Sequence, residues 1–148
     1  MVKSIKYWES LSKSRRPLNK SYEFLVSCYT DVLIPAKLNF FSFIASIFEP
    51  YLTVFQTGAP MVPFMYNELE KIILRLLGLI CKKGKLSEML KSSWLENKDN
   101  LLDVNRLDVG AATQTALREA NIRPENKRRF LLDCQLIIKT IIQKLIEK

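Results

Sequence analysis

Apolar residues recur at helical spacing along most of this 148-residue chain. Residues 2–13 predict a short amphipathic helix, and Pro17 ends it because proline lacks a backbone N–H and does not fit a helix interior. Residues 22–29 predict a second helix, with Ser21 as its N-cap. The first part of the chain is therefore expected to be helical and interrupted by short breaks.

The most apolar segment, residues 36–49, predicts a buried helix. It is hydrophobic on nearly every side, a pattern typical of a helix surrounded by others. Pro35 suits its first turn, whereas Pro50 is expected to stop or kink it. The sequence TGAP at 57–60 then predicts a turn, because glycine tolerates positive φ and proline fixes the exit of the chain.

The next predicted helix spans residues 64–83 and completes a helical hairpin around the turn. Its apolar residues form one stripe: Met65, Leu69, Ile72, Leu76, Leu79 and Ile80. Four residues are expected to anchor the helices on either side of the corner: Phe55, Met61, Phe64 and Leu69. The prolines and the glycine between the two apolar segments are interpreted as the residues that form the corner between two core helices.

The second half of the chain begins with an irregular connection over residues 84–108. Residues 109–120 predict a helix with a face of small residues, closed by Asn121, and a final helix begins at Pro124. Its expected buried stripe is Phe130, Cys134, Ile137, Ile141 and Leu145. We predict one all-α domain over 1–148, a compact bundle of about six helices with core helices in 2–83 and C-terminal helices in 109–148.

The formal net charge of +8 suits an anionic partner such as DNA, and it equally suits a solvated basic surface. Three basic clusters lie at predicted helix ends, where a bundle can gather them at one pole. The candidate nucleic-acid contacts are Arg15, Arg16, Lys82, Lys83, Lys85, Lys127, Arg128 and Arg129. The KKGK run at 82–85 is open to two readings, a phosphate site or cations that complement the end of a helix.

The inventory of reactive side chains argues against an enzyme. The chain has no histidine, and its three dispersed cysteines, Cys28, Cys81 and Cys134, predict reduced, buried thiols in an intracellular protein. A nucleophile paired with histidine is excluded, and zinc is poorly served. Asp99, Asp103 and Asp108 would bind a metal only if they converged; a solvated loop is the other interpretation. We expect no catalytic residue, no cofactor and no metal site.

Several stretches resemble transposon-derived animal proteins of the hAT-like transposase type. The resemblance rests on RRPLNKSY, IPAKLNFF, LTVFQTGAPMVPFMYNEL and the tail from DVGAATQTALREAN onward, and it is loosest over 84–104. It implies that the chain corresponds to the helical part of a DNA-cutting enzyme with an RNase H-like core. The acidic catalytic residues, the zinc finger and the dimerisation region of that family have no counterpart here, so no catalytic residue is carried over.

Three functions remain open at this point. The chain is a non-catalytic helical fragment of a hAT-like protein, a small basic module that binds DNA weakly and without sequence preference, or a protein-interaction domain. The expected partners are accordingly DNA, the remainder of a transposase-like protein, or a second copy in a homo-oligomer. The longest uncharged apolar run, residues 38–48, is too short for a membrane span, which needs about 20 residues. We expect neither a membrane nor a small-molecule substrate, and an intracellular location, including the nucleus.

Overall fold

The computed structural model describes residues 7, 10–11, 19–56, 62–82 and 95–147. These residues form five α-helices and two short 3₁₀ turns and contain no strand, so the all-α prediction is confirmed. The predicted helix over 2–13 lies mostly outside the described residues, as do the turn at 57–61 and residues 83–94. The elements are α2 (Lys20–Thr30), α3 (Ile34–Phe55), α4 (Val62–Ile80), η4 (Lys98–Asn100), η5 (Val104–Arg106), α5 (Ala111–Glu119) and α6 (Pro124–Ile146).

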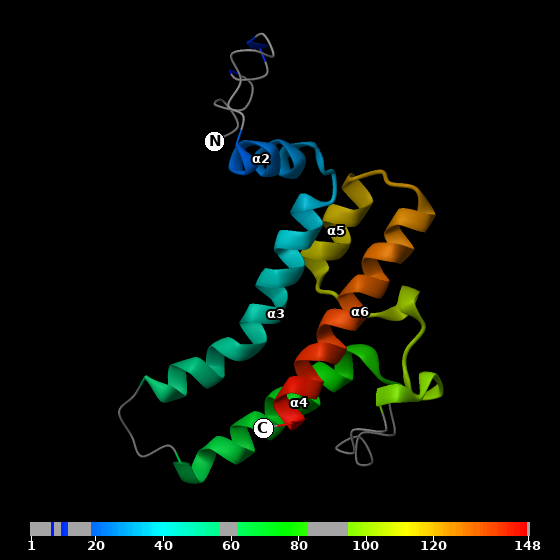
Figure 1. Cartoon of the computed structure of the whole chain (residues 1–148). Coiled ribbons are helices and arrows are strands. Elements are labelled where there is room, and N and C mark those ends of the chain that lie inside the picture. Colours follow the sequence, from blue (N-terminus) through cyan, green and yellow to red (C-terminus); the bar gives the residue numbers. More distant parts are fainter. Residues whose placement is uncertain (1–6, 8–9, 12–18, 57–61, 83–94, 148) are drawn as a thin grey trace.

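The two longest helices of the N-terminal half, α3 and α4, run side by side as the arms of a hairpin (Figure 1). Pro35 lies in the first turn of α3 as predicted, but Pro50 lies inside the helix, which continues to Phe55. Of the two expected outcomes, a stop or a kink, the stop is therefore not observed, and the helix continues past Pro50 as the other outcome allows. A proline removes one intrahelical hydrogen bond, and the packing of the neighbouring turns outweighs this loss.

The core lies where α3 packs against α5 and α4 packs against α6. The ring of Phe40 on α3 meets that of Phe130 on α6 edge-to-face, with centroids 6.5 Å apart. Buried side chains of α4 are Ile72, Ile73, Leu76, Leu77, Leu79 and Ile80, and those of α6 are Phe130, Leu131, Cys134, Ile138 and Ile142. The stripe on α6 is thus centred one residue beyond the predicted Ile137 and Ile141, which are only partly buried.

Near the hairpin corner, the described apolar side chains of α4 are less buried than those farther along the helix. Phe64 and Met65 are exposed, and Leu69 is partly buried against the core. The placement of Met61 and of the Phe55 side chain lies outside the description. The hydrophobic stripe of α4 is therefore covered only in its C-terminal half, where α6 lies against it.

The connection before α5 closes the C-terminal end of α4. The backbone N–H groups of Leu102 and Asp108 donate to the carbonyls of Ile80 (2.7 Å) and Leu79 (3.4 Å), and Lys82 donates to Asn100 (3.1 Å). Leu95, Leu107 and Val109 are buried. The last carbonyls of a helix have no intrahelical partner, so this segment, predicted as an irregular connection, satisfies them and adds to the core.

Gly110 marks the closest approach between the start of α5 and α3. Its φ is +84°, and a Cβ placed on it would lie 2.8 Å from the Phe43 ring. Asn39 of α3 donates to the Ala112 carbonyl at 3.3 Å. Asn121, with φ +44°, follows the end of α5 as the sequence predicts. The close approach of Gly110 to Phe43 and the hydrogen bond from Asn39 hold α5 against α3.

Helix α2 stands apart from this core. Its N-cap is Asn19, whose Oδ1 accepts from the Tyr22 N–H at 2.7 Å, so the assignment of the cap to Ser21 is wrong. None of the residues of α2 is buried. No single described helix is both long and apolar enough to cross a membrane, although α2 and Ile34–Val54 of α3, which meet at a 94° bend, pass that test as a pair.

Candidate interaction surface

The structure describes four of the eight predicted basic contacts. Lys127, Arg128 and Arg129 are exposed in the first turns of α6. Lys82 lies beyond the end of α4, where its Nζ donates to the Asp99 carbonyl at 2.7 Å. The other four candidates lie outside the described residues: Arg15, Arg16, Lys83 and Lys85. Lys82 therefore takes part in closing the end of α4, whereas the three cations of α6 face solvent.

The excess of positive charge lies largely outside the part of the chain that the structure describes. Nine of the 23 lysines and arginines, but only two of the 15 acidic residues, fall in the undescribed stretches. The described residues hold the remaining 14 cations and 13 acids, a net charge of +1. Their charges alone do not predict a nucleic-acid surface, because such surfaces carry a marked cationic excess.

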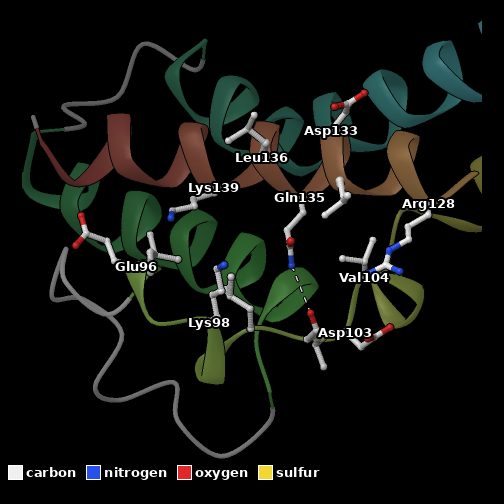
Figure 2. A pocket seen from close by; sticks show the side chains of 13 residues that line it. Glu96, Lys98, Asp103, Val104, Arg128, Asp133, Gln135, Leu136 and Lys139 are labelled. Carbon is white, nitrogen blue, oxygen red and sulfur yellow. Dashed lines mark hydrogen bonds between the residues drawn. The ribbon is translucent and has the colours of Figure 1, made fainter. Parts of the chain in front are cut away.

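A groove of about 610 Å³ with described walls lies between the η4–η5 connection and α6. Figure 2 shows Lys98 and Lys139 toward one end and Arg128 with Asp103 at the other. Gln135 crosses the groove and donates to the Leu102 carbonyl at 3.4 Å. Leucines and a valine line the remainder: Leu95, Leu101, Leu102, Val104, Leu132 and Leu136.

The carboxylates of this groove do not converge. Glu96 and Asp103 lie toward opposite ends, and Asp133, which lies on α6, is directed away from both of them (Figure 2). Among the described residues, no three histidine, cysteine or acidic side chains are grouped so that they could hold a metal ion. The groove therefore supplies mixed charges over an apolar floor, without a cluster suited to acid–base or metal chemistry.

The two buried thiols are poor nucleophiles. Burial raises the pKa of Cys81 to about 12 and, with a contribution from the Asp133 charge, that of Cys134 to about 12. Reactive cysteines instead have a depressed pKa in an electropositive site, because the thiolate is the nucleophile. These thiols fit the interpretation of cysteine as a small buried hydrophobe.

Among the described residues, the outer side of α3 exposes several large apolar side chains. The prediction that this helix is buried all round is wrong: α4 and α5 cover one side, and Leu38, Phe41 and Leu52 on the other side are 64%, 57% and 56% exposed. Large apolar side chains exposed together on one helix face are typical of an interaction site. We call this side of α3 the outer stripe: it consists of the exposed Leu38, Phe41, Ala45 and Leu52, together with Ile34 and Phe48, which are partly buried, Phe48 against the core.

The outer stripe follows the heptad spacing of paired helices. Its six residues lie alternately four and three positions apart from Ile34 to Leu52. Such spacing, averaging 3.5 residues, keeps an apolar seam facing a neighbouring helix. The buried side of α3 carries its own seam, made of Ala36, Phe40, Ile44 and Ile47. Helix α3 thus has two seams, and the described residues cover one of them.

Sequence reasoning missed the outer stripe as a candidate site because it treated every apolar position of α3 as core. The spacing of the apolar residues along α3 could have revealed this surface. Two separate seams on one helix predict two neighbouring surfaces, whereas a single core helix of a small domain needs only one. Which seam remains open depends on where α4 and α5 pack, and the sequence does not give this.

Comparisons with known proteins leave the chain without an assigned family. No protein-family model, no curated protein and no solved structure matches it. The resemblance to hAT-like proteins accordingly stays an expectation from sequence stretches. The function has to be argued from the surfaces described above.

Proposed function

We propose that this chain is a non-catalytic helical interaction domain and that the outer stripe of α3 is its binding surface. The observation that carries the proposal is the exposure of Leu38, Phe41 and Leu52 on one side of the most apolar helix. Removing a leucine or phenylalanine side chain from water stabilises a complex by about 1.5–3 kcal/mol. A partner helix seated on the stripe would gain this energy several times over, which favours association.

The proposal agrees with the resemblance to hAT-like proteins. A helical part taken from a larger protein has surfaces that the remainder once covered. If this chain derives from such a protein, the outer stripe is the face that met the missing part, and a domesticated or decaying remnant keeps it open. The scattered carboxylates of the groove and the high pKa of the buried thiols support a role in binding rather than in catalysis.

A photo-crosslinking experiment tests this function. A photoreactive amino acid replaces Leu38 in one variant and Thr140, an exposed residue of α6, in a control variant. Irradiation in cells that express the full chain should give discrete protein adducts at position 38, and weaker or no adducts at position 140. Equal adduct patterns at the two positions would refute the outer stripe as the binding surface.

A second candidate function, binding to the DNA backbone, is favoured by one observation. Lys127, Arg128 and Arg129 are exposed at the start of α6, and no described carboxylate forms an ion pair with them. The positive end of the helix dipole adds to their charge. Such contacts would be insensitive to sequence, with Kd around 10⁻⁴–10⁻⁶ M at physiological salt.

Fluorescence anisotropy with labelled duplex DNA separates this candidate from the first. Neutralising the three cations with glutamine should reduce the dependence of log Kd on log salt by up to about 0.9 per lost phosphate contact. Leu38→Glu, which alters the outer stripe and leaves these cations in place, is the matched control and should leave DNA binding nearly unchanged. Binding that does not respond to salt would refute the DNA function.

A further inference from the structure

The outer stripe also indicates its own partner. We infer that α3 of a second copy of this chain covers the stripe, antiparallel to the first α3, in a dimer with two-fold symmetry. The inference rests on the proposed interaction function and adds the identity of the occupant. It follows from the sizes, the charges and the extent of the stripe.

The side chains of the stripe complement themselves in an antiparallel pair. Suppose that the two-fold axis passes the helices at the level of residue 43. Ile34 of one copy then faces Leu52 of the other, and Leu38 faces Phe48. In the central layers, the large Phe41 faces the small Ala45. A two-fold axis repeats every one of these contacts, since a residue pair i and j recurs as j and i. Large residues opposite small ones are what a closely packed seam requires.

Charge does not oppose this pairing. None of the six stripe residues is charged, and the nearest cation, Lys37, is bound to the Asp31 carboxylate at 2.5 Å. Glu49, on the exposed side of α3, has no acidic residue of the same helix as a neighbour in the antiparallel arrangement. The described residues carry a net charge of only +1, so two described cores repel each other weakly.

The described part of the chain leaves Leu38, Phe41, Ala45 and Leu52 of the stripe open to solvent. Helix α2 departs from the start of α3 at a 94° bend and does not run along it (Figure 1). Helix α3 has 22 residues, which corresponds to a length of about 33 Å. A contact along this length covers on the order of 500 Å² of each copy, less than the ~800 Å² per partner of standard interfaces. We therefore expect a reversible dimer with Kd on the order of 1–50 µM.

Sedimentation velocity of the purified full chain tests the dimer. The mass should rise from 17.2 kDa toward twice that value as the concentration increases. Leu38→Glu places a carboxylate in the seam twice per dimer and should raise Kd at least about tenfold. Leu136→Glu is the matched control, because Leu136 is 62% exposed on α6, away from the stripe, and its substitution should leave Kd unchanged.

A thiol crosslink tests the antiparallel direction. In a Cys28→Ser background, Ile34→Cys chains are mixed with Leu52→Cys chains and treated with a short bismaleimide. Antiparallel α3 helices bring positions 34 and 52 of different copies together, so the mixture should give a heterodimer. Leu52→Cys alone should not crosslink, because like positions then lie about 27 Å apart along the axis. Cys81 and Cys134 are buried and should not react in the folded protein.

The outcomes separate this inference from the proposed function. A chain that stays monomeric up to about 500 µM, ten times the weakest expected Kd, overturns the dimer. Efficient self-crosslinking of Leu52→Cys overturns the antiparallel direction. If the chain is monomeric but the photoreactive residue at 38 captures a different protein, the interaction function stands and the second copy is refuted as its occupant. If neither experiment detects contact at the stripe, both fail.

Discussion

Replacing Gly110 with alanine tests the packing of α5 against α3 most directly. The backbone of Gly110 has φ +84° and ψ 147°, a region that residues with a Cβ rarely adopt. Forcing alanine into it costs about 1–3 kcal/mol. The new Cβ would also lie 2.8 Å and 2.9 Å from two atoms of the Phe43 ring, closer than carbon atoms pack.

The second cost arises from this overlap. Phe43 packs against the core and belongs to a helix held by α4 and α5, so its ring has to shift or α5 has to move away. Overpacking of this kind typically costs about 1–3 kcal/mol. The two effects together predict a loss of about 2–6 kcal/mol in the free energy of unfolding, a large part of the roughly 5–15 kcal/mol that stabilises a typical domain.

Urea denaturation followed by far-UV circular dichroism measures the effect. With a slope of about 1–3 kcal/mol per molar urea, the midpoint should fall by about 1–2 M. Gly78→Ala is the matched control, since Gly78 is exposed within α4 and nothing lies within 4 Å of an added Cβ. Alanine there should stabilise the helix by about 0.5–1 kcal/mol.

A double variant separates the two contributions. Phe43→Leu shortens the side chain opposite Gly110 and by itself should cost less than about 1.5 kcal/mol. Combined with Gly110→Ala, it should cost less than the sum of the single losses, because the overlap is relieved and only the backbone term remains. If Gly110→Ala has the same midpoint as the wild type, the close approach of α5 to α3 is refuted.

Three further predictions concern single side chains. The Thr113 side chain is fully buried, and its hydroxyl has no hydrogen-bond partner among the described residues. Thr113→Val should therefore raise the free energy of unfolding by about 1 kcal/mol. Thr113→Ser keeps the hydroxyl and loses a methyl group, so it should lower the free energy of unfolding by about 1 kcal/mol. A destabilised valine variant would contradict this reasoning. A hydrogen bond from Lys37 lowers the pKa of Asp31 below its ordinary 3.8. The stability that this pair contributes is present above pH 3.8 and is lost as the pH falls through the lower pKa of the folded state. Because the pair is partly exposed, Asp31→Asn should lower the free energy of unfolding by under about 1 kcal/mol at pH 7. In urea titrations at strongly acidic pH, the variant and the wild type should have the same free energy of unfolding. A difference that stays constant with pH would argue against the ion pair. Finally, the high pKa and the burial of Cys81 and Cys134 predict that only Cys28 of the native protein reacts with an aromatic disulfide reagent at pH 8. In urea, all three thiols should react. Fast reaction of three thiols in the native protein would be inconsistent with the described core.

The order of the helices could be predicted from the sequence because its causes are local. Helical periodicity located α2, α3, α4, α5 and α6, and Pro35 and Pro124 marked the first turns of two of them. A proline at a helix start and an apolar repeat of 3.6 residues act within a few positions of the chain. Burial of Cys81 and Cys134 was likewise predictable, since isolated cysteines behave as small hydrophobes, but the same prediction is wrong for Cys28, which is only partly buried on α2.

Errors in the prediction arose where a neighbour in space decides the outcome. The sequence left open whether Pro50 stops or kinks the helix, and α3, packed against its neighbours, continues past it to Phe55. It treated residues 84–108 as an irregular connection, whereas Leu107 is a core residue and the segment caps α4. On α6 the buried stripe is rotated toward Ile138 and Ile142, because α4 and η5 determine which side is covered.

The candidate binding surface shows the same division most clearly. The sequence by itself determined that α3 is apolar on two sides, including the spacing of Leu38, Phe41 and Leu52. Only the tertiary structure decided which of those sides faces water, because burial depends on the number and direction of packed neighbours rather than on the composition of the helix. Helices α4 and α5 cover one side of α3, and the described residues leave Leu38, Phe41 and Leu52 on the other side exposed to water.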